Sequence, residues 1–223
     1  MKRENLKGHC KIFLISGGIL LLLFTLWTLL IQAVDVQKVG VNGTEVGFAT
    51  INTWVHSLTG VNMTLYNITD WLGLVPVFVC MGFGVFGLVQ MIKRKSLLKV
   101  DKDIILLGIY YVIVIFGYLV FEMIPINYRP ILINGFMEAS YPSSTTLLVV
   151  SVMPTLIFQL SLRVKNVKIK WTVSAVVIGF SAFMVLGRLI SGVHWVTDIV
   201  GSLLLSGGLY YSYKGLALIS FKG

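Results

Sequence analysis

His194, Asp198 and Arg188 are the residues best suited to chemistry, and they lie close together in GRLISGVHWVTD. On a continuous helix, His194 and Asp198 would share one face because they are four residues apart. An aspartate bound to one imidazole nitrogen leaves the other free as a nucleophile or base. Arg188 adds a planar guanidinium suited to phosphate oxygens. Two interpretations stay open: a phosphate-reactive site, or a turn at Ser191 and Gly192 with an interfacial histidine that caps the next helix.

A second polar segment contains YPSSTT, from Tyr141 to Thr146, with Arg129 upstream as another cation. Pro142 followed by Ser143 or Ser144 is typical of a helix start, where backbone N–H groups and hydroxyls bind anions. Two arginines, a helix N-terminus and a His–Asp pair would together form a phosphate site. No cluster of metal-ligating residues accompanies them, so the sequence predicts neither a metal nor a cofactor.

These residues must be positioned by helices in a membrane. Of the 223 residues, 57% are hydrophobic and only 12% are charged, which is more apolar surface than a soluble domain can bury. Six apolar runs approach the ~20 residues that a helix needs to cross a bilayer. They cover about 12–33, 72–92, 104–124, 144–162, 171–188 and 199–218. We therefore expect a single all-α domain over residues 1–223, a polytopic membrane protein with six transmembrane helices.

Basic residues indicate the orientation of these helices. They gather before the first run, in the links at 93–102 and 163–170, and near the end of the last run. The opposite side carries only Lys38, Arg129 and Arg188. The positive-inside rule then places both termini in the cytoplasm and the polar motifs on the extracytoplasmic face of the cell membrane. The net charge of +9 reflects this topology and contact with membrane lipids, so we predict no nucleic-acid partner.

The longest exterior segment, at about 34–71, contains apolar residues at helical spacing. They are Phe48, Ile51, Trp54, Val55 and Leu58. Polar residues fall between them. The pattern predicts either an amphipathic helix at about 45–60 in the outer membrane interface, or a loop packed over the helix bundle.

The order of the motifs is similar to that of a known family. RP at 129–130, PSS at 142–144 and GR-x5-H-x3-D at 187–198 follow one another along the chain. They resemble the K-x6-RP, PSGH and SR-x5-H-x3-D signatures of the type 2 phosphatidic acid phosphatase superfamily. The resemblance covers about residues 120–200. It implies a six-helix membrane enzyme that removes phosphate from a lipid phosphate or diphosphate without a metal.

The resemblance also implies a role for each matching residue. His194 would be the nucleophile that forms a phosphohistidine, and Asp198 would orient it. Arg129 and Arg188 would bind phosphate oxygens, and Ser143 would donate to the phosphoryl group. Stabilising charge on those oxygens is usually the largest catalytic contribution.

Three positions depart from the signatures. The lysine of the first is Glu122, and the serine before Arg188 is Gly187. Thr145 replaces the histidine of PSGH, which donates a proton to the leaving group. A threonine hydroxyl is no general acid near neutral pH, and losing such an acid typically costs ~10²–10⁴ in rate. Glu138 or Glu122 is a candidate substitute if its environment keeps it protonated.

The missing histidine leaves two hypotheses. The first is a lipid phosphatase or phosphotransferase that prefers a diphosphate, such as a polyprenyl (undecaprenyl) diphosphate. A phosphate leaving group is far less basic than an alkoxide, so it needs a proton less. The second is a non-catalytic lipid-phosphate binder or carrier that keeps the same site residues.

Overall fold

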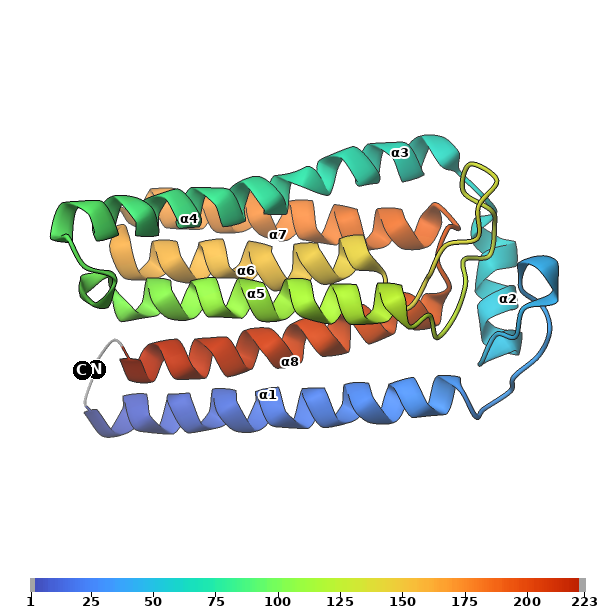
Figure 1. Cartoon of the computed structure of the whole chain (residues 1–223), viewed down its shortest axis with the longest axis horizontal. Coiled ribbons are helices and arrows are strands. Elements are labelled where there is room, and N and C mark those ends of the chain that lie inside the picture. The colour runs from blue at the N-terminus through green and yellow to red at the C-terminus, as the bar shows by residue number, and fades with distance from the viewer. Residues whose placement is uncertain (1–2, 221–223) are drawn as a thin grey trace.

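The chain folds into a bundle of long helices (Figure 1). The computed structural model describes residues 3–220. The helices are α1 (Arg3–Ile31), α2 (Ala49–Thr59), α3 (Met63–Leu72), α4 (Leu74–Arg94), α5 (Lys102–Met123), α6 (Ser144–Arg163), α7 (Val167–Ile190) and α8 (Val196–Ser220). Two 3-10 turns, η1 (Val41–Gly43) and η2 (Leu97–Lys99), lie in the links. The described residues contain no strand, which confirms the predicted all-α class.

Five helical stretches are long and apolar enough to cross a membrane, so the chain is a multi-pass membrane protein. They are Gly8–Ile31, Met63–Arg94, Lys102–Met123, Ser144–Arg163 and Val167–Ile190. The sixth predicted span falls on α8, whose mean hydropathy is lowered by Asp198, Lys214 and several hydroxyl residues. Because α8 packs on α1, α5 and α6, most of these polar groups contact protein and need not face lipid. A membrane span at α8 stays a prediction.

The helix ends lie in two groups, one at each end of the bundle (Figure 1). The start of α1, the α4–α5 and α6–α7 links and the end of α8 lie at one end of the bundle. The opposite end holds α2, the 124–143 segment and the α7–α8 link. Arg129 and His194 therefore meet at one end although they are distant in sequence. The assignment of this end to the extracytoplasmic side, with the termini opposite, stays a prediction; residues 1–2 and 221–223 lie outside the described part of the chain.

Helix α2 lies across that end of the bundle (Figure 1), within the segment for which an amphipathic helix is predicted. Asn52 is fully buried and donates to Thr197 Oγ1 at 3.0 Å. Ile51, Trp54 and Leu58 are exposed. The polar side of α2 thus packs on the bundle, while its apolar side faces outward, as suits a helix at a membrane surface.

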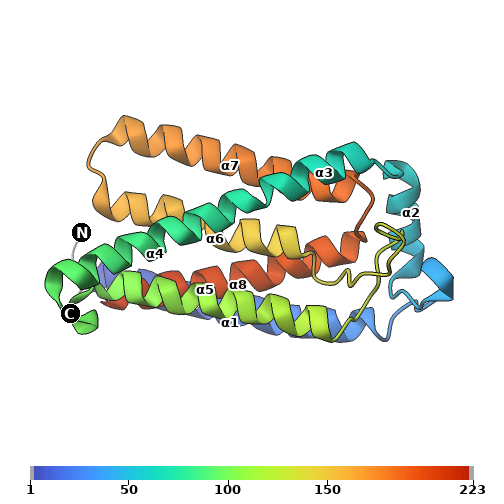
Figure 2. The ribbon, with the colours of Figure 1, turned by 45° about the horizontal axis from the view of Figure 1, so that its top comes forward.

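Helix α3 precedes α4, and only Gly73 separates them. The helix predicted at 72–92 therefore continues a longer helical stretch, and residues 63–71 are helical where the sequence analysis assigned only an exterior segment. The two helices cross the bundle obliquely (Figure 2): α3 packs on α7, and α4 passes over α6 and ends beside α5. This path brings one face of α3 to the end of α7.

Hydroxyl groups of α8 hold the start of α6. Ser202 donates to the carbonyl oxygen of Ser143 at 3.0 Å, and Ser206 donates to that of Leu147 at 3.1 Å. The backbone N–H of Ser143 also lies 3.4 Å from the carbonyl oxygen of Asp198. These contacts fix the start of α6 against the start of α8, where two of the sequence motifs meet.

Candidate active site

His194 lies in the short link between α7 and α8 and is almost fully buried. Its Nδ1 is 3.1 Å from the backbone carbonyl oxygen of Ser140. A carbonyl only accepts, so Nδ1 carries the proton and donates it to Ser140. The other nitrogen, Nε2, is buried and has no hydrogen-bond partner among the described residues. The tautomer that this contact selects leaves the Nε2 lone pair free for nucleophilic attack.

Asp198 is linked to His194 largely through Ser140. Its Oδ2 accepts from the Ser140 hydroxyl and, at 2.8 Å, from the backbone N–H of Trp195. The Ser140 hydroxyl lies 3.2 Å from His194 Nδ1, whereas Asp198 Oδ2 is 3.6 Å from it. Helix α8 begins at Val196, so His194 precedes the helix and does not share a helical face with Asp198. Ser140 therefore belongs to the site, although no sequence motif marked it.

Arg188 is buried at the end of α7 and contacts one face of α3. Its Nη1 lies 3.4 Å from Thr69 Oγ1 and 3.6 Å from Asp70 Oδ1. Its guanidinium carbon stands 4.8 Å from the centre of the Tyr66 ring. No motif predicted these partners; the available signal was that Tyr66, Thr69 and Asp70 stand at positions i, i+3 and i+4, so that they share one face of a helix.

Arg129 also lies close to the Tyr66 ring. Its guanidinium carbon lies 5.7 Å from the centre of the Tyr66 ring, and its Nε is 3.1 Å from Glu138 Oε2. Both Arg129 and Arg188 are buried, and each keeps at least one guanidinium nitrogen without a hydrogen-bond partner among the described residues. Two buried guanidinium groups close to one ring offer donors suited to an anion such as phosphate.

The positive charges also act on the imidazole. Burial lowers the pKa of His194 well below its ordinary value, and the charges of Arg129 and Arg188 lower it further. A neutral imidazole keeps the lone pair that a nucleophile needs. The site therefore keeps His194 in its nucleophilic form at neutral pH.

The start of α6 adds backbone donors to this site. The helix begins at Ser144 with Ser143 at the N-cap position. Ser143 is fully buried, and its hydroxyl donates to Thr146 Oγ1 at 3.1 Å. The N–H groups of a first helical turn favour an anion. The sequence motifs thus converge at one end of the bundle, which places Ser143 beside the Asp198 backbone.

Thr145 faces a cavity of about 460 Å³ between α4, α5 and α6. Ser144 and Asp70 line the same cavity, and the rest of its wall is largely apolar. The two glutamates considered as proton donors lie elsewhere: Glu138 pairs with Arg129, and Glu122 is exposed beside a small cleft that Ser144 also lines. Neither glutamate is among the described residues that line the cavity of Thr145.

Comparisons with known proteins identify a family and a similar fold. A family model described as the PAP2 superfamily matches residues 76–216, which include Arg129, Ser143, Arg188, His194 and Asp198. A crystal structure of a transmembrane PAP2 type phosphatidylglycerolphosphate phosphatase from Bacillus subtilis has a similar fold, with a TM-score of 0.65 and 18% sequence identity. The similarity covers 90% of this chain and 95% of that one. Among curated proteins, none matches the sequence.

Proposed function

The chain belongs to the PAP2 superfamily, and from this premise we propose that it is a membrane lipid phosphatase or phosphotransferase. It acts on a lipid phosphate or diphosphate at the extracytoplasmic face, through a phosphohistidine at His194. The observation that carries the proposal is the free, buried Nε2 of His194 in a site that also holds two buried arginines. Such a site binds a phosphoryl group and presents a nucleophile to it.

The residues of the site suggest how each step proceeds. Arg129 and Arg188 bind the equatorial phosphoryl oxygens, and His194 Nε2 attacks phosphorus. The bond from phosphorus to the lipid-side oxygen breaks as the P–N bond forms, and the lipid alcohol or lipid monophosphate leaves with the electron pair. The imidazole becomes positively charged as the P–N bond forms. Its Nδ1–H stays fixed on the Ser140 carbonyl, and the nearby Asp198 carboxylate stabilises the charge. Water then attacks the phosphohistidine and releases phosphate, or another acceptor takes the phosphoryl group.

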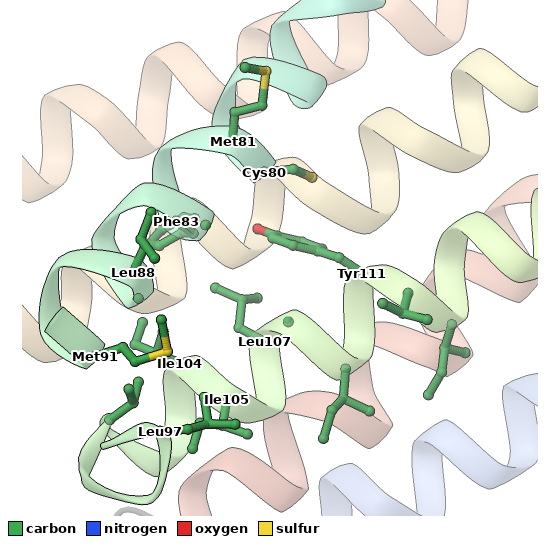
Figure 3. Close-up of a pocket in the computed structure, with 17 residues that line it drawn as sticks. Cys80, Met81, Phe83, Leu88, Met91, Leu97, Ile104, Ile105, Leu107 and Tyr111 are labelled. Carbon is green, nitrogen blue, oxygen red and sulfur yellow. The ribbon is translucent and has the colours of Figure 1, made fainter. Parts of the chain in front are cut away.

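An apolar crevice supports a lipid as the substrate. Between α4 and α5 lies a cavity of about 830 Å³ whose wall is almost entirely apolar (Figure 3). Cys80 and Tyr111 line both this crevice and the cavity that contains Thr145. A hydrocarbon chain in the crevice would leave its phosphate near Asp70 and Arg188. Because this crevice extends along both α4 and α5, it suits a long, slender hydrocarbon chain such as that of a polyprenyl diphosphate.

The leaving group is tested by comparing substrates with one chain and different phosphates. We expect purified protein to release phosphate from farnesyl diphosphate faster than from farnesyl monophosphate, with a chelator present, because the phosphate leaving group is less basic than the alkoxide. The variant His194→Ala should release none from either. Equal or faster monophosphate turnover would contradict the preference for a diphosphate. Tight binding of both lipids without His194-dependent turnover would instead favour the non-catalytic binder.

A further inference from the structure

We propose that Asp70 is the proton donor to the leaving group and takes the place of the histidine that Thr145 replaces. The inference rests on the proposed phosphatase function and names one further catalytic residue for it. Asp70 lies on α3, before the residues 76–216 that match the family model. None of the three signature motifs includes this position.

The carboxyl group of Asp70 lies at the border between the anion site and the lipid cavity. Its Oδ1 is 3.6 Å from Arg188 Nη1, which belongs to the anion site. Asp70 and Thr145 both line the same cavity, and Gly73 lies close to both: a β-carbon added at Gly73 would stand 2.8 Å from the Asp70 carbonyl oxygen and 3.4 Å from Thr145 Cγ2. In a bound lipid phosphate, the oxygen that joins phosphorus to the lipid must lie at this border. Of the carboxyl groups described, Asp70 is the one that lines this cavity.

The carboxyl group of Asp70 is open to solvent. Its side chain is 57% exposed, so a proton can exchange with water. The charged and titratable groups near it are Arg188 on α7, Tyr66 on α3, Cys80 on α4, and Tyr111 and Tyr118 on α5. A phosphate bound at this site pairs with the guanidinium of Arg188 in place of Asp70. It also brings negative charge beside the Asp70 carboxyl group.

The proton then has a defined path through both chemical steps. As the bond from His194 Nε2 to phosphorus forms, the bond from phosphorus to the lipid oxygen breaks. The lipid oxygen keeps the electron pair and takes the proton from Asp70, so an alcohol leaves. In the second step a water oxygen attacks phosphorus, the P–N bond breaks, and its electron pair returns to Nε2. The Asp70 carboxylate accepts a proton from that water and is ready for the next turnover.

The test compares the turnover of substrates whose leaving groups differ in basicity. We expect Asp70→Asn in the full-length protein to lower kcat for farnesyl monophosphate by ~10²-fold, the usual effect of a lost general acid. Turnover of farnesyl diphosphate and of p-nitrophenyl phosphate should fall only slightly, because these leaving groups need little protonation. Their retained turnover also shows that the variant is folded. The conservative Asp70→Glu should recover part of the monophosphate activity, and adding Thr145→His to Asp70→Asn should restore it.

Control variants distinguish a proton donor at Asp70 from a positioning role and from a proton donor at another residue. Glu45 is an exposed carboxyl residue away from the site, so Glu45→Gln should leave all three activities unchanged. An equal loss on all three substrates in Asp70→Asn would overturn the proposal and make Asp70 a positioning residue for Arg188. Unchanged or increased monophosphate turnover would overturn it as well, as would a selective loss in Glu122→Gln or Glu138→Gln instead. If the His194→Ala variant turns over every substrate at the wild-type rate, the proposed function itself is contradicted.

Discussion

Ser140 offers a sharp test of how the histidine is held. Its backbone carbonyl fixes the Nδ1–H of His194, and its hydroxyl donates to Asp198 Oδ2. The variant Ser140→Ala removes only the hydroxyl, so the tautomer of His194 should be kept. Asp198 would retain the N–H of Trp195 but lose one of its donors. We therefore expect an enzyme that is impaired and still active.

The size of the effect follows from the lost contact. A hydrogen bond to a charged group is worth ~1.5–3 kcal/mol, and it should matter most when positive charge forms on His194. Because 1.36 kcal/mol corresponds to a factor of ten in rate, kcat should fall by about 10- to 160-fold. KM should change little, since Arg129 and Arg188 are untouched. Asp198→Ala should cost more, because it removes the charge itself.

The assay is steady-state phosphate release from a lipid phosphate in detergent micelles, with kcat and KM determined separately. Ser212→Ala is the matched control, since Ser212 is half-buried near the other end of α8 and donates to a carbonyl of its own helix, that of Gly208, at 2.8 Å. A loss of less than about threefold in kcat for Ser140→Ala, or a rise in KM alone, would refute the idea that Asp198 acts through Ser140.

Two further predictions concern charge and packing. Arg129→Gln removes a positive charge that lowers the pKa of His194, so the pKa should rise in the variant. The acid limb of a plot of kcat/KM against pH should therefore move to higher pH. An acid limb at the same pH as in the wild type would contradict this electrostatic coupling. Asn52→Ala should lower stability by ~1–3 kcal/mol, because buried groups of Thr197 lose their partners on α2. Thermal unfolding would measure this loss, and a Tm no lower than that of the exposed control Asn67→Ala would contradict it.

Much of the fold could be predicted because hydropathy and length constrain membrane helices strongly. The long apolar runs, the all-α class and the meeting of Arg129 with His194 at one end follow from that constraint. Helix α3 was missed because it is short, polar on one face and continuous with α4. Its polar face is explained by Arg188, a contact that depends on tertiary packing.

The candidate site was predicted in part for a similar reason. His194, Asp198 and the arginines follow fixed spacings that a single sequence displays. Ser140 has no such spacing. It reaches His194 because the 124–143 segment folds back on itself, with an antiparallel bridge between Tyr128 and Ala139. A contact of this kind leaves no periodic pattern along the chain.

The most direct test of the central claim is the capture of the covalent intermediate. Protein mixed with a lipid phosphate labelled with ³²P should be quenched rapidly in alkali, where phosphohistidine survives. The account predicts label on a peptide that contains His194, and no label in His194→Ala. Phosphate release at an undiminished rate from His194→Ala, or label at a different residue, would contradict the assignment of His194 as the nucleophile.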